Sequence, residues 1–156
     1  MGSKSFSQEI QTSVSADRMF KAFVMDWHNL APKVMPDKVE SVKAVEGQGG
    51  PGSIRQINFT SAMPFSYVKE RLDAIDKNKL ECKNTLLEGG DIGTKIESAC
   101  SHMKFVPTSG GCTVKVETTY KTLPGVAESD EAKKAQEGLA ASLKAVEKYL
   151  VEHPSA

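Results

Sequence analysis

Residues 129–151 constrain the fold more than any other part of the sequence. Their apolar members are three or four positions apart, which places them on one stripe of an α-helix. Ser129 suits the N-cap, Asp130 and Glu131 suit the positive end of the helix dipole, and Pro154 follows the far end. At ~1.5 Å per residue this helix is roughly 35 Å long, enough to cross a small domain. The stripe consists of Ala132, Ala135, Leu139, Leu143, Val146 and Leu150.

Small residues occupy the middle of this predicted helix. Gly138, Ala140, Ala141 and Ser142 lie close together, and a glycine inside a helix costs about 1 kcal/mol relative to alanine. A helix that buries one face normally fills that face with large side chains. Two interpretations are open. The helix approaches a sheet closely, which the small residues alone favour, or it covers a hollow.

Composition limits the classes of function. The 156 residues suit one domain, so we expect a single domain over residues 1–156. Lysine and arginine balance aspartate and glutamate, and a net charge of zero argues against partners such as nucleic acid or a membrane surface. No apolar run approaches the ~20 residues of a membrane span. The first residues show no signal-peptide core, and Phe6 breaks the N-myristoylation pattern. We expect a cytoplasmic monomer.

The cysteines and histidines predict no metal site or cofactor. Three cysteines without paired spacing, and without an export signal, are expected to be reduced thiols. The histidines are scattered, and together with the cysteines they make no metal-ligand spacing. These residues are Cys82, Cys100, Cys112, His28, His102 and His153.

The order of predicted elements indicates the fold class. Strands are expected over residues 5–13, 39–46, 53–60, 65–75, 80–88, 94–106 and 112–121. Two short helices are predicted after the first strand, over residues 16–25 and 27–34, the second broken by Pro32 and ended by Pro36. Consecutive strands with tight turns imply an antiparallel sheet, and the terminal helix makes the fold α+β.

The inward-facing positions of the later strands mix apolar and polar side chains. Polar examples are Asn84, Ser101 and Thr118, and Cys82 is a further small residue. A dry core rarely tolerates so many hydroxyl and amide groups without partners, whereas a ligand-sized cavity containing water does. The strand over 65–72 is ambiguous, because Phe65 and Tyr67 face one way and Glu70 and Leu72 the other unless a bulge intervenes.

Several motifs along the whole chain resemble one family. They are MFKAF at 19–23, NLAPKV at 29–34, EGQGGPG at 46–52, FSYVKER at 65–71, LEGG at 87–90 and AVEKYL at 145–150. The sequence is similar to the plant class-ten pathogenesis-related proteins, the birch-pollen-allergen family, and most of all to wound- and pathogen-induced members from monocots.

The resemblance implies a fold and a function. The fold is a seven-stranded curved antiparallel sheet wrapped around a long C-terminal helix, with two short helices after the first strand and a large internal hydrophobic cavity. The implied function is the binding, storage or transport of small hydrophobic plant metabolites or hormones, such as cytokinins, flavonoids or sterols, in plant defence.

The predicted ligand-binding residues combine an apolar lining with a few polar groups that orient a ligand. Tyr67, Glu70, Asn84 and Tyr120 are expected to supply the polar contacts. The complete set is Phe23, Val39, Ile57, Phe59, Phe65, Tyr67, Glu70, Cys82, Asn84, Leu86, Ala99, Ser101, Met103, Val116, Tyr120, Leu139 and Ser142.

The glycine-rich segment 46–52 joins two predicted strands. Phosphate capture by its backbone N–H groups is one interpretation, but it leads into no helix and lacks the Lys-Ser/Thr of a Walker A loop. A rigid turn that needs several residues with positive φ is the favoured one. The residues are Glu46, Gly47, Gln48, Gly49, Gly50, Pro51 and Gly52.

Catalysis is the alternative to binding alone. Ribonuclease activity is attributed to several members of the resembling family, and its proposed residues fall here on Arg55, Glu97, Glu147 and Tyr149. This set contains no histidine, arginine replaces the family's lysine, and the chain is not basic. We therefore rank this alternative second.

Other members of the resembling superfamily act as enzymes or receptors. For the related norcoclaurine synthases, the catalytic lysine position corresponds to Cys82, and a thiol cannot form the iminium. The aspartate position corresponds to Ala99, so only Tyr67 and Glu70 remain. The loops at 60–64 and 88–93 do not match those of abscisic-acid receptors. An auxiliary catalyst acting on a specialised metabolite stays open.

Overall fold

The computed structural model describes residues 4–47, 50–126 and 131–154. Within these ranges seven strands form one antiparallel sheet in the order β1-β7-β6-β5-β4-β3-β2. Strands β2 to β7 pair with their neighbours in sequence, and β1 closes against β7. The strands are β1 (Lys4–Thr12), β2 (Val39–Glu46), β3 (Ile54–Phe59), β4 (Tyr67–Asp76), β5 (Glu81–Gly89), β6 (Ile96–Thr108) and β7 (Gly111–Thr122).

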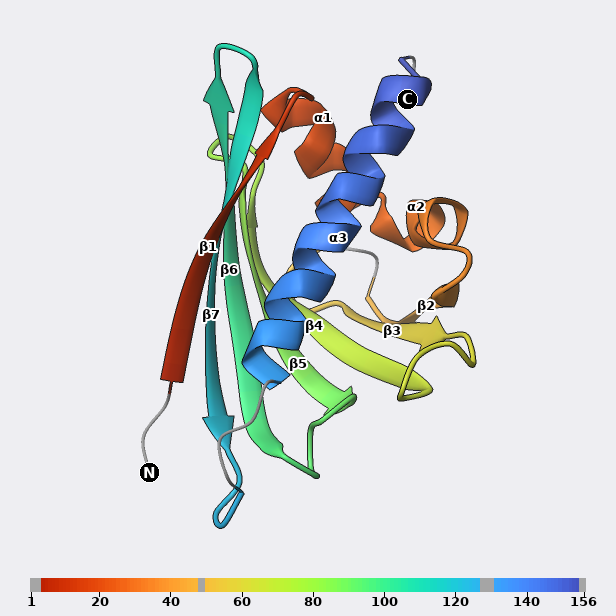
Figure 1. Ribbon diagram of the computed structural model, residues 1–156, viewed down its shortest axis with the longest axis vertical. Helices are drawn as coiled ribbons and strands as arrows, with labels where there is room; N and C mark the ends of the chain where they lie inside the picture. The colour runs from red at the N-terminus through yellow and green to blue at the C-terminus, as the bar shows by residue number, and fades with distance from the viewer. Residues whose placement is uncertain (1–3, 48–49, 127–130, 155–156) are drawn as a thin grey trace.

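The helices lie on one side of this curved sheet (Figure 1). They are α1 (Ala16–Phe20), the π-helical turn η1 (Lys21–Met25), α2 (Trp27–Val34) and α3 (Glu131–Glu152). The long helix α3 runs across the concave side of the sheet, and the short helices lie beside it near its C-terminal half. The predicted α+β fold, with seven antiparallel strands and a long terminal helix, is confirmed.

Two local predictions about the short helices are wrong. The segment 16–25 is not one α-helix, because Asp26 N–H bonds to the Lys21 carbonyl five residues earlier and widens the turn from Lys21 onward. Ser15 does cap α1, accepting a hydrogen bond from Arg18 N–H at 3.4 Å. Pro32 lies inside α2 without breaking it, because it removes a single N–H while the buried face around Trp27 and Leu30 keeps the helix in place.

The dry part of the core gathers around the C-terminal half of α3. Leu143, Val146 and Leu150 are almost completely buried. Phe20 of α1 and Phe105 of β6 meet edge to face with ring centroids 5.6 Å apart. Fully burying each such side chain contributes roughly 1.5–3 kcal/mol, so this end of the molecule supplies much of the stability.

Polar contacts fix the same half of α3 to the corner after β1. Glu147 accepts a hydrogen bond from Ser13 N–H at 2.7 Å, and Lys144 Nζ donates to the Gln11 carbonyl at 2.6 Å. The Arg18 guanidinium donates to the Leu150 carbonyl at 2.9 Å, at the end of the helix. These bonds hold the helix against β1 and α1 and do not draw it onto the centre of the sheet.

The middle of α3 does not approach the sheet closely. A Cβ atom built on Gly138 would have no neighbour within 4 Å, apart from the adjacent residues and the backbone of its own helix. Gly138 is exposed to solvent, so close packing against the sheet does not explain this glycine. The second interpretation, a hollow, is supported instead by the cavity that Ala135 and Leu139 of α3 border. The proposed N-cap Ser129 and its neighbour Asp130 lie outside the described residues. None of the helices in the described ranges has the length and apolar character needed to cross a bilayer.

Candidate functional site: an internal cavity

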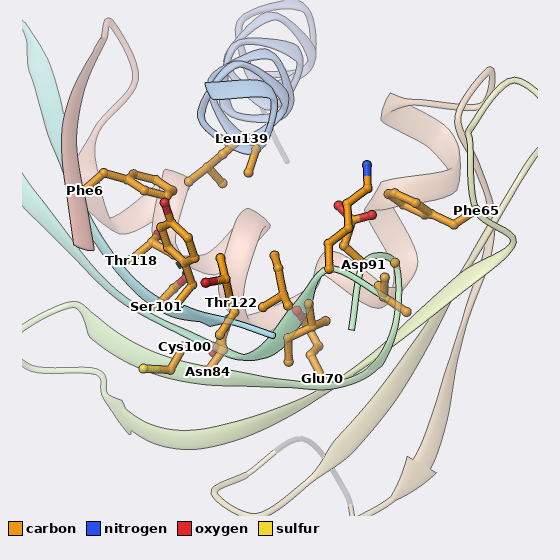
Figure 2. Close-up of a pocket in the computed structure, with 18 of the residues that line it drawn as sticks. Phe6, Phe65, Glu70, Asn84, Asp91, Cys100, Ser101, Thr118, Thr122 and Leu139 are labelled. Carbon is orange, nitrogen blue, oxygen red and sulfur yellow. Dashed lines mark hydrogen bonds between the residues drawn. The ribbon is translucent and has the colours of Figure 1, made fainter. Parts of the chain in front are cut away.

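A cavity of about 460 Å³ lies between the N-terminal half of α3 and strands β1 and β4 to β7. In Figure 2, Leu139 projects from the helix toward Ser101 and Thr118 on the sheet, with Phe6 to one side. Phe65 and Asp91 border the opposite side. The volume lies within the ~300–1,000 Å³ typical of small-molecule sites, so a ring compound fits. We call this space the large cavity.

A second cavity of about 270 Å³ lies against the short helices. Its walls are η1 and the start of α2 on one side, and β2, β3 and the inner positions of β4 to β6 on the other. Glu70 and Asn84 are the residues that border both spaces. We call this second space the small cavity.

The large cavity is mainly apolar with a few hydroxyl groups. Tyr120 of β7 packs near Phe6 of β1, their ring centroids 6.1 Å apart. Ser101 Oγ and Thr118 Oγ1 lie 3.3 Å apart on adjacent strands and share one hydrogen bond. Such a lining buries apolar ligand surface while the hydroxyl groups orient the ligand.

An ion pair borders the cavities, with Glu70 lining both and Arg55 lining the small one. Arg55 Nε of β3 and Glu70 Oε1 of β4 are 2.5 Å apart, and both side chains are largely shielded from solvent. The two residues are direct neighbours in the β3–β4 register. A paired arginine and glutamate keep the wall neutral overall while leaving polar atoms exposed to a ligand.

Cys82 faces the small cavity close to this ion pair. Burial, with a smaller contribution from the Glu70 carboxylate that Arg55 opposes, raises the pKa of its thiol to about 12. The group is therefore a neutral thiol at physiological pH and a poor nucleophile. It can serve as apolar wall, and it does not suit covalent catalysis.

Most of the predicted ligand-binding residues border one of the cavities. Those on the large cavity are Phe65, Glu70, Asn84, Leu86, Ala99, Ser101, Tyr120 and Leu139. Those on the small cavity are Phe23, Glu70, Cys82, Asn84 and Met103. Their contact with a ligand stays a prediction.

Three predicted lining residues belong instead to the dry core: Val39, Ile57 and Val116 are buried and border neither cavity. Val39 lies under α2, where its N–H bonds to the Met35 carbonyl at 2.8 Å. The alternation of a strand identifies its inward face, but the position of the helices decides which part of that face is filled. The placement of these residues in the cavity is corrected accordingly.

Tyr67 lies on the other face of the sheet, so its predicted place in the cavity is also corrected. Between Lys69 and Glu70 the register with β5 shifts by one residue, and the inward positions of β4 are Val68, Glu70 and Leu72. Desolvation and a hydrogen bond with Glu88 raise the pKa of Tyr67. The extra residue at this shift is Leu87 of β5, so β4 keeps its alternation from Tyr67 to Leu72 and no bulge turns Tyr67 inward.

Phe59 and Ser142 also lie outside the cavity linings. The Phe59 ring packs edge to face on Phe65, with centroids 5.4 Å apart, and so supports a lining residue. Ser142 Oγ donates to the Gly138 carbonyl of its own helix at 3.0 Å, the usual arrangement of a serine inside a helix. Neither side chain borders the space itself.

The glycine-rich segment is tied to β4. Gly47 and Gly52 have φ angles of 78° and 87°, which side chains other than glycine rarely adopt. Gly52 N–H donates to the Leu72 carbonyl at 2.7 Å, and Ser53 N–H to the Gly50 carbonyl at 3.0 Å. These bonds support the turn interpretation. Glu46 borders the small cavity, whereas Gln48 and Gly49 lie outside the described residues.

The residues of the ribonuclease hypothesis have partners on different elements. Arg55 pairs with Glu70, Glu97 lies 3.4 Å from Lys121, and Glu147 is bound by Ser13. Tyr149 stacks on His153 with centroids 4.2 Å apart. Each has a structural role where it stands, and the described contacts bring no two of them together.

The sequence reasoning missed several lining residues. Phe6 of β1 alternates with exposed residues, and that signal could have found it. Next to the predicted Phe23, the turn η1 contributes Val24 and Met25, and three lining residues in succession are not expected from a helical stripe. Asp91 and Lys95 come from the β5–β6 loop, where no periodicity exists to guide a prediction.

Metal chemistry finds no support in the described part of the chain. No group of three or more His, Cys, Asp or Glu residues there could hold an ion. Cys82 and Cys112 are buried free thiols, and Cys100 is exposed. Although Cys100 borders the large cavity, Figure 2 shows its side chain directed away from the other labelled residues.

A long helix over a curved sheet, with a hollow between them, is the architecture that the motifs led us to expect. The model of the "Pathogenesis-related protein Bet v 1 family" matches residues 1–153. The chain belongs to the Bet v 1 family. The predicted family is thus confirmed.

Individual members of the Bet v 1 family, and solved structures with its fold, are similar over nearly the whole chain. Pathogenesis-related protein 1 of Asparagus officinalis is 52% identical, covering 100% of this chain and 99% of its own. The crystal structure of Ara h 8.0201 superposes with a TM-score of 0.86 at 28% identity, covering 97% of this chain and 100% of its own. The structure of norcoclaurine synthase from Thalictrum flavum superposes with a TM-score of 0.82 at 24% identity, covering 97% of this chain and 88% of its own. This similarity shows a shared fold alone.

Proposed function

We propose that this protein binds small, largely apolar plant metabolites in its internal cavity, as a carrier or store in plant defence. One observation carries the proposal: a cavity of about 460 Å³ with an apolar lining and a few hydroxyl groups lies where a domain of this size would otherwise place its core. The relative named as a pathogenesis-related protein supports the defence context.

The chemistry of the lining suggests the class of ligand. Aromatic and aliphatic walls favour planar or fused-ring compounds, and the Ser101–Thr118 pair and Tyr120 favour a hydroxyl or carbonyl group on the ring. Cytokinin-, flavonoid- and sterol-like compounds have this character. At ~0.3 kcal/mol per heavy atom, a ligand of ~20 atoms gains about 6 kcal/mol, a dissociation constant in the tens of micromolar.

Displacement of a fluorescent dye tests the proposal. The protein is loaded with 1-anilinonaphthalene-8-sulfonate and titrated with a panel of cytokinins, flavonoids and sterols. Some of these compounds should displace the dye. Ala99→Phe, which fills the large cavity, should weaken the binding of these compounds about tenfold or more, a change of ~1.4 kcal/mol in binding free energy.

Ser98→Phe is the matched control. Ser98 is the exposed neighbour of Ala99 on β6 and lines neither cavity, so the same large side chain should leave affinity unchanged. Equal binding by Ala99→Phe and wild type, or displacement by none of the compounds, would contradict the proposal. Conversion of a panel compound to a product, followed by mass spectrometry, would point to the catalytic alternative.

A further inference from the structure

A row of polar side chains crosses the sheet where the sheet forms the wall of the large cavity. Asn84 of β5 is the register partner of Ser101 on β6, and Ser101 is the register partner of Thr118 on β7. All three residues line the large cavity. In Figure 2 they follow one another along the sheet, on the side that Leu139 of α3 faces. We call these three residues the polar row.

Less polar residues flank the polar row. At its two ends, Asn84 pairs with Leu72 of β4, and Thr118 pairs with Phe6 of β1. Because neighbouring strands lie ~4.8 Å apart, the row offers hydrogen-bonding groups over roughly 10 Å in one direction only, across the strands. Two positions away along the strands, the adjacent rows are Leu86, Ala99 and Tyr120 on one side and Cys82, Met103 and Val116 on the other.

The Asn84 end of the polar row is available to a ligand. Among the described residues, the Asn84 amide has no hydrogen-bond partner, so it keeps its N–H donors and its carbonyl oxygen for a group in the cavity. The nearby Glu70 carboxylate, in contrast, is already held by Arg55 Nε at 2.5 Å. A ligand that pairs with the amide therefore makes hydrogen bonds that the protein itself does not supply.

The other end of the polar row is only partly satisfied. The hydroxyl oxygens of Ser101 and Thr118 lie 3.3 Å apart and share one hydrogen bond, in which one hydroxyl group donates to the other. The accepting hydroxyl group keeps its proton for a ligand, and both oxygens keep lone pairs. Each end of the row can therefore donate to a ligand and accept from it, which suits a hydroxyl or a carbonyl group.

We propose that Asn84, together with Ser101 and Thr118, selects flat ring compounds that carry an oxygen group at each of two opposite ends. Such a ligand lies across β5, β6 and β7, with one group bound by Asn84 and the other by the Ser101–Thr118 pair, and its rings pack beneath α3. This inference rests on the proposed function and deepens it by naming the class of ligand. A compound with one polar end, such as a sterol, satisfies one end of the row and leaves the other without a partner.

Two naphthalene derivatives test this selection, because they share one ring system and differ by one hydroxyl group. 2-Naphthol carries a single hydroxyl group, whereas 2,6-dihydroxynaphthalene carries one at each end. Titration followed in ¹H–¹⁵N NMR spectra measures both dissociation constants and shows that each variant is folded. The wild type should bind the dihydroxy compound about three- to tenfold more tightly than 2-naphthol, since one further hydrogen bond forms in the cavity.

Two variants disable the polar row from its two ends. Asn84→Leu removes the amide at similar side-chain volume, and the double variant Ser101→Ala/Thr118→Val removes both hydroxyl groups. Each should reduce the preference for the dihydroxy compound to less than about twofold and keep the affinity for 2-naphthol within about threefold, because 2-naphthol can use the remaining end. Ser98→Ala/Thr119→Val is the matched control on the same two strands. Its positions line neither cavity, so the preference should persist.

The outcome also separates this inference from the proposed function. Equal binding of the two compounds by the wild type, or a preference that survives in either variant of the row, would overturn the inference. In both cases, displacement of the dye by panel compounds would leave the proposed function standing. If neither the naphthalene derivatives nor the panel compounds bind the wild type, both the inference and the proposed function fall.

Discussion

At the scale of single residues, the environment of each thiol decides its chemistry. Cys82 borders the small cavity beside the Glu70 carboxylate, Cys112 is buried against Thr12, and Cys100 is exposed. Burial raises the pKa of both Cys82 and Cys112, and the value for Cys82 is about 12. The three cysteines cannot be distinguished in the sequence, whereas in the folded protein Cys100 is accessible and Cys82 and Cys112 are buried and unreactive.

Alkylation of the native protein should therefore modify Cys100 alone. At pH 8 a pKa of about 12 leaves roughly one part in ten thousand of Cys82 as thiolate, and access is blocked as well. Iodoacetamide labelling followed by peptide mass spectrometry measures this, and Cys100→Ser should abolish labelling until the protein is unfolded. Labelling of Cys82 at a rate close to that of Cys100 would show that the small cavity is open to solvent and its thiol ionised.

Glu147 links pH to stability at the same scale. Burial would raise the pKa of its carboxyl group, but hydrogen bonds from Ser13 and the ammonium group of Lys144 lower it below the ordinary 4.5. The ionised form therefore stabilises the fold above about pH 4.5, and this contribution is lost as the pH falls through the lower folded value.

Glu147→Gln should cost about 1 kcal/mol of unfolding free energy at neutral pH, because the charged acceptor is lost. Between about pH 5 and pH 3 the variant should lose less stability than the wild type, since it no longer titrates. Urea unfolding at several pH values measures both effects. Glu97→Gln, at an exposed pair 3.4 Å from Lys121, is the control and should change little. An acid response identical to that of the wild type would exclude the role given to Glu147.

At the scale of elements, α3 has two different halves. Leu143 of its C-terminal half is completely buried among core residues, whereas Leu139 is partly buried and faces the large cavity. The sequence places both residues on one stripe and gives no sign of the difference. Only the positions of α1 and α2, which fill one end of the sheet, separate a packed half from a hollow half.

Truncation of these two leucines should therefore have unequal costs. Leu143→Ala should lose about 2–5 kcal/mol of unfolding free energy, because it leaves a void in a packed core. Leu139→Ala should lose about 1 kcal/mol, because its side chain already borders empty space. Chemical denaturation measures both. Equal losses would mean that the helix packs against the sheet along its whole length.

The same scale shows which parts of the fold can be predicted from sequence. Alternation correctly indicated that Cys82, Asn84 and Leu86 share a face of β5, because successive side chains of a strand point to opposite faces of the sheet. Placing Tyr67 in the cavity together with Glu70 required a bulge within β4 between them, whereas the extra residue is Leu87 of β5 and β4 alternates regularly from Tyr67 to Leu72. Strand periodicity is local information, and a bulge arises from the partner strand.

At the scale of the whole molecule, the sequence motifs alone predict the Bet v 1 family and its seven-stranded fold, and both predictions are confirmed. The division of the interior could not be predicted in this way. Glu70 of β4 and Asn84 of β5 border both cavities, and Arg55 of β3 pairs with Glu70 through the register of the strands. The small cavity also depends on η1, whose widened turn places Phe23 and Met25 beside it.

A crystal structure grown with the tightest compound from the displacement panel tests the central claim, that α3 covers a space in which a metabolite binds. We predict ligand density between Leu139 of α3 and Ala99 and Tyr120 of the sheet, with the helix in place. Density confined to the outer surface, or a helix collapsed onto β5 to β7 with no space beneath it, would contradict the account.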